Sequence, residues 1–134
     1  MQHIVLDTNA LIMAISAKNV YHKVWKAFLD GNYILCITNE IVEEYLEVLA
    51  RNINAQVAEA IVYAILSRWN VQKLDPHFRF HLIQSDDDDN KFVDCAIAAN
   101  ARYIVTEDHH FDILKEIDFP IVDVIGIDEF AQLL

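Results

Sequence analysis

Acidic side chains follow two apolar runs of strand length in this chain. Asp7 directly follows residues 3–6, and Asp108 comes just after residues 103–106. In an α/β sheet the carboxyl ends of parallel strands meet at one edge, where ligands bind. Asp7 could instead serve only as the cap of the next helix, since Asp is a favoured cap residue. Asp112 lies one helical turn beyond Asp108, where it could support the same edge.

The helix predicted over residues 39–51 adds further acids. Glu40 and Glu47 fall nearly opposite its apolar face, where they are ordinary solvated charges. Glu43 and Glu44 fall on the two borders of that face, so either could be drawn into a site at the sheet edge. Surface solvation is the simpler interpretation for both. The apolar face itself comprises Ile41, Val42, Tyr45, Leu46, Val48 and Leu49.

A run of four acids, residues 86–89, leads into an Ala-rich helix. Such a run usually forms a solvated loop, or it places negative charges at a helix N-terminus, where they interact favourably with the helix dipole. Asp94 differs because it lies inside the helix and small residues follow it on its own face. These let the helix approach the sheet closely, with one carboxylate near the edge. Asp89, in the first turn, is the other candidate contributor.

Carboxylates that meet at one edge must have their repulsion offset. Two unit charges about 5 Å apart repel by roughly 3 kcal/mol at an effective dielectric of about 20. Without a cation some would be protonated. An all-oxygen set without a Cys/His cluster favours Mg²⁺ or Mn²⁺ over Zn²⁺. Such sites serve phosphoryl displacement by water, and no Ser, Cys or Lys is placed for covalent catalysis.

The composition predicts one globular domain over residues 1–134, with 54% hydrophobic residues. No apolar run approaches the roughly 18 residues of a membrane span, and no secretory signal is present, so we expect a cytoplasmic protein. Cys36 and Cys95 match no metal or redox motif and are expected as buried free thiols. The net charge of −11 counts against simple electrostatic capture of nucleic acid. It fits a carboxylate-bound cation and a basic protein partner.

Predicted strands and helices alternate along the chain, which indicates a three-layer α/β/α sandwich with a mainly parallel sheet. Residues 39–69 are expected to form a helical hairpin that offers a surface to another chain. Residues 78–83 could be extended. The predicted strands are 3–6, 33–37, 71–74, 103–106 and 121–125, and the predicted helices are 10–17, 20–29, 39–51, 54–69, 91–101, 109–117 and 127–134.

Four motifs in order resemble those of a PIN domain: residues 5–9, 43–49, 88–96 and 105–111. The chain looks most like the stand-alone toxin group related to VapC-type ribonuclease toxins, from Ile4 to about Ile125. The resemblance implies a metal-dependent ribonuclease fold in which acids from four segments bind Mg²⁺ or Mn²⁺. It also implies a homodimer and a separate antitoxin whose tail covers the site.

Carried over residue by residue, the resemblance makes Asp7 the first metal ligand and Glu44, rather than Glu43, the second. Asp94 best matches the third acid and Asp108 the fourth. Asp89 is the alternative third ligand, because close relatives emphasise the acid pair at residues 88–89.

Smaller polar residues around these acids match supporting positions of the family. Thr8, Asn9 and Thr106 match positions that support the metal and its waters. His109 and His110 match variable positions and are expected as surface residues.

The sequence therefore predicts a metal-dependent endoribonuclease that hydrolyses RNA and acts as the toxin of a toxin–antitoxin pair. A basic antitoxin would suit its acidic surface. One alternative is a catalytically inactive PIN-like binding scaffold. Another is a receiver-type signalling domain, which would need an acid pair near the first strand and a strand-end Lys. A phosphatase with an aspartyl nucleophile would need Asp where the chain has Asn9.

Overall fold

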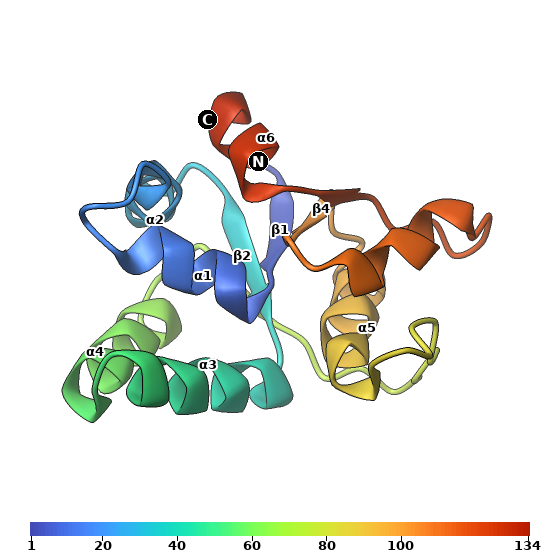
Figure 1. The fold of residues 1–134 in the computed structure, drawn as a ribbon, viewed down its shortest axis with the longest axis horizontal. Coiled ribbons are helices and arrows are strands. Elements are labelled where there is room, and N and C mark those ends of the chain that lie inside the picture. Colours follow the sequence, from blue (N-terminus) through green and yellow to red (C-terminus); the bar gives the residue numbers. More distant parts are fainter.

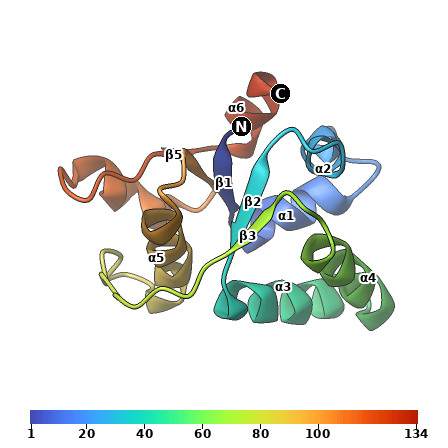
Figure 2. The ribbon, with the colours of Figure 1, turned by 180° about the vertical axis from the view of Figure 1, so that it is seen from behind.

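A five-stranded parallel sheet with strand order β3-β2-β1-β4-β5 forms the centre of the computed structural model, which describes residues 1–134 (Figures 1 and 2). The prediction of a mainly parallel sheet is confirmed. Because every strand points the same way, all five carboxyl ends lie along one edge. The strands are β1 (His3–Leu6), β2 (Ile34–Ile37), β3 (Val71–Lys73), β4 (Tyr103–Val105) and β5 (Val124–Ile125).

Helices cover both faces of this sheet, as the sequence predicted. In Figure 1, α1 to α4 lie on one side of the strands and α5 lies on the other, where it contacts β1, β2 and β4. The change of side follows from the strand order, since right-handed crossovers that run in opposite directions along a sheet cover opposite faces. The helices are α1 (Thr8–Ile15), α2 (His22–Leu29), α3 (Asn39–Asn52), α4 (Ala55–Leu66), α5 (Asn90–Ala99) and α6 (Ile127–Leu133), with 3-10 helices η1 (Asp87–Asp89) and η2 (His109–Glu116).

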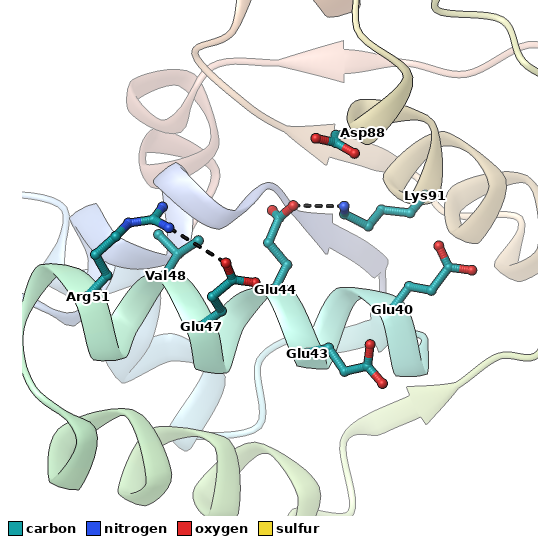
Figure 3. Close-up of a pocket in the computed structure, with 8 residues that line it drawn as sticks. All are labelled: Glu40, Glu43, Glu44, Glu47, Val48, Arg51, Asp88 and Lys91. Atoms are coloured by element: carbon teal, nitrogen blue, oxygen red, sulfur yellow. Dashed lines mark ion pairs between the residues drawn. The ribbon is translucent and has the colours of Figure 1, made fainter.

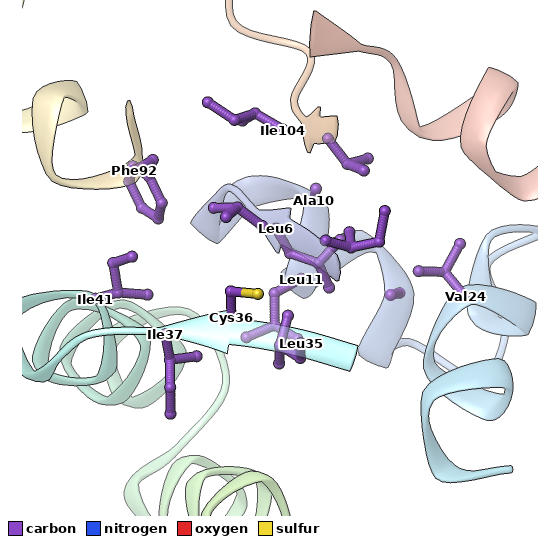
Figure 4. Packing of buried hydrophobic residues seen from close by; sticks show 14 of the residues in the cluster. Leu6, Ala10, Leu11, Val24, Leu35, Cys36, Ile37, Ile41, Phe92 and Ile104 are labelled. Carbon is purple, nitrogen blue, oxygen red and sulfur yellow. The ribbon is translucent and has the colours of Figure 1, made fainter. Parts of the chain in front are cut away.

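The buried core lies between the strands and α1, α2, α3 and α5 (Figure 4). Leu6, Leu11 and Leu35 are among its fully buried side chains. Burying one such side chain stabilises the fold by roughly 1.5–3 kcal/mol. Cys36 and Cys95 are buried free thiols in this core, as expected. No helix is both long and apolar enough to cross a membrane.

The predicted hairpin of α3 and α4 is confirmed, and both of its helices begin at side-chain caps. The Thr38 hydroxyl accepts a hydrogen bond of 3.2 Å from the N–H of Ile41. The Asn54 side chain accepts one of 2.8 Å from the N–H of Val57. Each bond satisfies an N–H that has no partner inside its helix. The two caps therefore fix where the two long helices start.

Three local predictions differ from the structure. A helix was predicted over residues 20–29, but α2 begins only at His22 and Val20 is exposed. Leu46 was expected on the apolar face of α3, but its side chain is exposed. Residues 78–83 are neither strand nor helix. They pair with no strand, since β3 ends at Lys73.

Candidate active site

Asp7 lies at the carboxyl end of β1, beside the end of β4. Parallel pairing sets Leu6 opposite Val105, and the Thr106 hydroxyl then donates a hydrogen bond of 2.6 Å to Oδ2 of Asp7. The Asp7 side chain is only 5% exposed. Although Asp7 occupies the cap position of α1, its side chain makes no capping bond. The carboxylate is therefore not used as a helix cap.

Glu44 reaches the same place from α3. Both of its oxygens have partners: the Thr8 hydroxyl donates to Oε2, and the Lys91 ammonium lies 2.7 Å from Oε1 (Figure 3). Burial lowers the pKa of Lys91, but the hydrogen bond to Glu44 and the charges of the nearby acids together outweigh this, so the pKa is raised overall. Figure 3 shows Glu43 pointing away from Lys91. Of the two acids on the borders of the apolar face, the structure thus brings only Glu44 to Thr8.

The hydroxyl of Tyr45 anchors this part of α3. It donates a hydrogen bond of 2.5 Å to the carbonyl of Leu6, the residue before Asp7. The ring is fully buried, and burial raises the pKa of the phenol well above its usual value, so it stays a neutral donor. Tyr45 therefore fixes the position of Glu44 relative to Asp7.

Asp89 and Asp108 complete the group of acids. The N–H of Asp108 donates to the Thr106 hydroxyl at 3.0 Å, so Thr106 connects Asp108 to Asp7. Burial raises the pKa of Asp89 to about 6, and the charges of Asp108, Asp86 and Asp7 act in the same direction. Asp7, Glu44, Asp89 and Asp108 are called the acid cluster below.

Electrostatics link the members of the acid cluster. Burial raises the pKa of Asp7, and the charges of Glu44 and Asp108 act in the same direction against the hydrogen bond from Thr106. The cost of ionising Asp7 thus comes from lost hydration and from neighbouring carboxylates. A bound cation would offset both effects.

His110 also lies at the acid cluster, which the sequence did not predict. Its Nδ1 is 3.2 Å from Asp89 Oδ2, 3.3 Å from Asp108 Oδ1 and 3.6 Å from Asp86 Oδ2. The bond to Asp89 and the charge of Asp108 raise its pKa. The side chain is 44% exposed, so it is a surface residue as expected, yet one that contacts the acids. The signal in the sequence is its position two residues after Asp108, whose carboxylate accepts the His110 N–H at 2.8 Å.

The structure does not bring Asp94 to the acid cluster. Its Oδ1 accepts a hydrogen bond of 3.1 Å from the N–H of Phe80. Burial raises its pKa, and the nearest charges acting on it are those of Arg79, His81 and Glu40. Because α5 begins only at Asn90, Asp94 lies one turn into the helix and beside residues 78–83, whereas Asp89 precedes the helix at the sheet edge.

The remaining predicted polar residues lie in different surroundings. Thr8 and Thr106 bond directly to acids of the cluster. The Asn9 side chain is exposed and forms no hydrogen bond. Asp112 pairs with His109 at 3.2 Å and with Lys115 at 3.8 Å, beside Asp108 in a small surface pocket.

A groove of about 420 Å³ runs between α3 and the start of α5 (Figure 3). Glu44 belongs both to this groove and to the acid cluster. Its charged lining is mostly acidic, so it suits cationic groups. The residues that line it are Glu40, Glu43, Glu44, Glu47, Val48, Arg51, Asp88 and Lys91.

The acid cluster fits a divalent cation in its donor chemistry. Four carboxylates supply hard oxygen donors, as Mg²⁺ and Mn²⁺ prefer. Only Lys91, at Glu44, and His110 offset their charge with a nearby cationic group. Asp86, Asp89 and His110 each offer one ligand atom, and these three atoms lie within 4.8 Å of one another.

One protein family and several solved structures are similar to this chain. The family model described as PIN domain matches residues 3–110. No match was found among curated proteins. A DNA-bound VapBC structure from Salmonella typhimurium has a similar fold, with a TM-score of 0.65, 19% identity, and 95% of this chain and 99% of that chain covered.

Two further structures share the fold. The sarcin-ricin loop cleaving toxin VapC20 from Mycobacterium tuberculosis has a TM-score of 0.60 and 15% identity, with 81% of this chain and 92% of that chain covered. The PIN domain endonuclease Utp24 has a TM-score of 0.55 and 18% identity, with 92% of this chain and 84% of that chain covered.

Proposed function

The chain belongs to the PIN domain family, and on this premise we propose that it is a metal-dependent endoribonuclease acting as the toxin of a toxin–antitoxin pair. The observation that carries the proposal is the acid cluster itself. Four segments far apart in the sequence deliver carboxylates to one edge of the sheet, with the hydroxyls of Thr8 and Thr106 directed at two of them. Its substrate would be RNA, cleaved at phosphodiester bonds by water.

We assign Asp7, Glu44, Asp89 and Asp108 to hold Mg²⁺ or Mn²⁺. Asp89 takes the third position because the charges of Asp108 and Asp7 act on its carboxylate, whereas that of Asp94 accepts the N–H of Phe80. When bound, a divalent ion supplies Lewis acidity toward water and toward the charge that develops on the phosphate.

The side chains around the acids hold them ready for this role. Thr106 fixes one oxygen of Asp7 by its hydrogen bond. Thr8 on α1 and Lys91 on α5 each hold one oxygen of Glu44. Preorganised donors of this kind reduce the rearrangement that a reaction requires.

An antitoxin and a second copy of the chain are the proposed partners. Support for the first comes from the fold shared with a chain of a VapBC complex. The acidic groove beside Glu44 would suit a basic antitoxin segment. The α3–α4 hairpin is the proposed partner surface, and the cytoplasm, where RNA is accessible, is the proposed location.

A catalytically inactive PIN-like scaffold is the main alternative. The complete acid cluster favours catalysis, since an inactive scaffold has no need to keep four repelling carboxylates together. A receiver-type domain fits less well, because Glu107 and Asp108 follow β4 where that class would need Lys.

Cleavage of labelled single-stranded RNA tests the proposal directly. The purified chain should cleave with Mg²⁺ or Mn²⁺, lose activity with chelator, and lose it in Asp7→Asn. Cleavage that resists chelator, or that the Asp7→Asn variant retains, would contradict the metal-dependent mechanism. Induced expression should also arrest growth, and Asp89→Asn should relieve the arrest.

A further inference from the structure

Residues 77–81 form a short segment in which basic and aromatic side chains alternate: His77, Phe78, Arg79, Phe80 and His81. The alternation is unusual in a chain with a net charge of −11. Phe78 is 76% exposed and Phe80 39% exposed, and their ring centroids are 6.5 Å apart. Most of the phenylalanines lie in the core, so two adjacent exposed rings require an explanation.

Hydrogen bonds and an ion pair hold this aromatic segment in place, although it has no regular secondary structure. Phe80 donates its N–H to Asp94 on α5 at 3.1 Å. Arg79 lies 2.6 Å from Glu40 on α3. Just beyond the segment, the Asn90 side chain bonds to both the N–H and the C=O of Ile83, at 2.9 and 2.8 Å. The segment is therefore fixed between the two helices that border the acidic groove.

Its attachment points lie one helical turn from the Glu44–Lys91 ion pair. Glu40 and Glu44 are four residues apart on α3, and Lys91 and Asp94 are three apart on α5, so each pair shares a helix face. One turn is about 5.4 Å along a helix. A small pocket lined by both Arg79 and Lys91 connects the two places.

We propose that Phe78 and Phe80 form a stacking surface for the bases of single-stranded RNA, next to the cleavage site. This inference rests on the proposed function and adds the way in which the RNA substrate is bound. Bases stack on exposed aromatic rings with little regard to sequence. In duplex RNA the bases are not available for such stacking, so the surface would select unpaired segments.

The charge of the chain favours stacking over electrostatic capture. A net charge of −11 disfavours capture of a phosphate backbone by overall electrostatic attraction. Contacts that do not depend on charge then gain weight, because Arg79 and Lys91 are already paired with Glu40 and Glu44. The buried core of a protein interface is depleted of charged residues. Here charged or basic side chains flank each ring.

A binding experiment with fluorescein-labelled single-stranded RNA tests this assignment. Fluorescence anisotropy measures the affinity in the presence of Mg²⁺, and all variants carry Asp7→Asn so that the RNA is not cleaved. Phe78→Ala with Phe80→Ala should weaken binding by about tenfold or more, because each stacked base contributes about that much. The corresponding double Tyr variant should bind as the parent does. Phe119→Ala is the matched control, since Phe119 is also an exposed phenylalanine but lies at another pocket.

The same variants in the cleaving chain separate this inference from the proposed function. The double Ala variant should raise KM with little change in kcat, and the chain should prefer single-stranded over duplex RNA. Unchanged binding and KM in the double variant, while the parent still cleaves, would overturn the stacking surface alone. If light scattering shows that the parent is an oligomer and the double Ala variant is a monomer, the rings belong to a protein interface and the stacking surface is also overturned. Absence of cleavage in the parent would overturn the proposed function as well.

Discussion

The Thr106 hydroxyl donates a 2.6 Å hydrogen bond to the Asp7 carboxylate, across 99 positions of the sequence. The same hydroxyl accepts the N–H of Asp108 at 3.0 Å. One small side chain thus orients the Asp7 carboxylate after β1 and holds the backbone of Asp108 after β4. Thr106 therefore has a positioning role in the site, although a neutral hydroxyl adds no charge to it.

Replacing Thr106 with Val should therefore weaken Mn²⁺ binding by about tenfold, as expected when a group that orients a metal ligand is lost. Thr106→Ser keeps the hydroxyl and should restore most of the affinity. Calorimetric titration of both variants with Mn²⁺ measures the effect. Equal affinity in the Val and Ser variants would show that the hydrogen bond does not position Asp7 for the metal.

Asp89→Asn and Asp94→Asn should separate the two candidates for the third ligand. Asp89→Asn should lower Mn²⁺ affinity by at least about tenfold, while Asp94→Asn should leave it nearly unchanged. The amide introduced by Asp94→Asn keeps an acceptor for the Phe80 N–H, so the thermal stability of that variant should change little. Calorimetry and thermal melting provide the two measurements. A loss of metal affinity in Asp94→Asn would return the third position to Asp94.

Removal of the Lys91 charge should affect Glu44 first. In Lys91→Met the carboxylate loses its ion pair in a partly buried site, so RNA cleavage should fall by about tenfold or more. Lys91→Arg keeps a cation near Glu44 and should retain more of the activity. Arg51→Met is a suitable control, because Arg51 pairs with the exposed Glu47 in the same groove. Equal losses in the two Met variants would point to the charge of the groove rather than to Glu44.

Thermal stability without metal should depend on pH in a defined direction. Burial raises the pKa of Asp89 from 3.8 to about 6, so between about pH 4 and 6 the unfolded state loses a proton that the folded state keeps. The contribution of Asp89 to the free energy of unfolding is therefore complete below about pH 4 and is lost as the pH rises to about 6. The pKa of His110 is raised by Asp89 and Asp108, so its contribution is lost at still higher pH.

The melting temperature in chelator should consequently be lower at pH 7.5 than at pH 5 through these two groups. Mg²⁺ should reduce the difference, because a cation compensates the ionised acids. Asp89→Asn removes the titrating carboxyl and should flatten the profile between about pH 4 and 6. A profile that is unchanged in Asp89→Asn would show that other acids cause the pH dependence.

Strand-end acids were predictable because apolar runs mark the strands and parallel pairing aligns their ends. Asp7 and Asp108 follow from that pattern alone. The choice of Glu44 over Glu43 does not, because a helical wheel leaves the two at nearly equal distance from the apolar face. Thr8 and Lys91 decide it, and both reach Glu44 only in the folded chain.

Two features of the site depend on short turns of the backbone that the sequence pattern does not reveal. Asp89 and Asp94 are distinguished by where α5 begins, and η1 sets that point through Asp86, whose carboxylate accepts the Asp88 N–H at 3.0 Å. His110 contacts the acids because η2 is a tight 3-10 turn that folds it back over Asp108. Hydrophobic periodicity carries no information about such turns.

The order of the strands also has a consequence for synthesis. β1 is paired with β4, and the acid cluster needs both strand ends. N-terminal segments leave the ribosome first, at about 5–20 residues per second, so Asp7 and Glu44 emerge seconds before Asp108. A nascent chain has no complete site until most of its length has emerged. The proposed ribonuclease site would thus stay incomplete during most of the synthesis of its own chain.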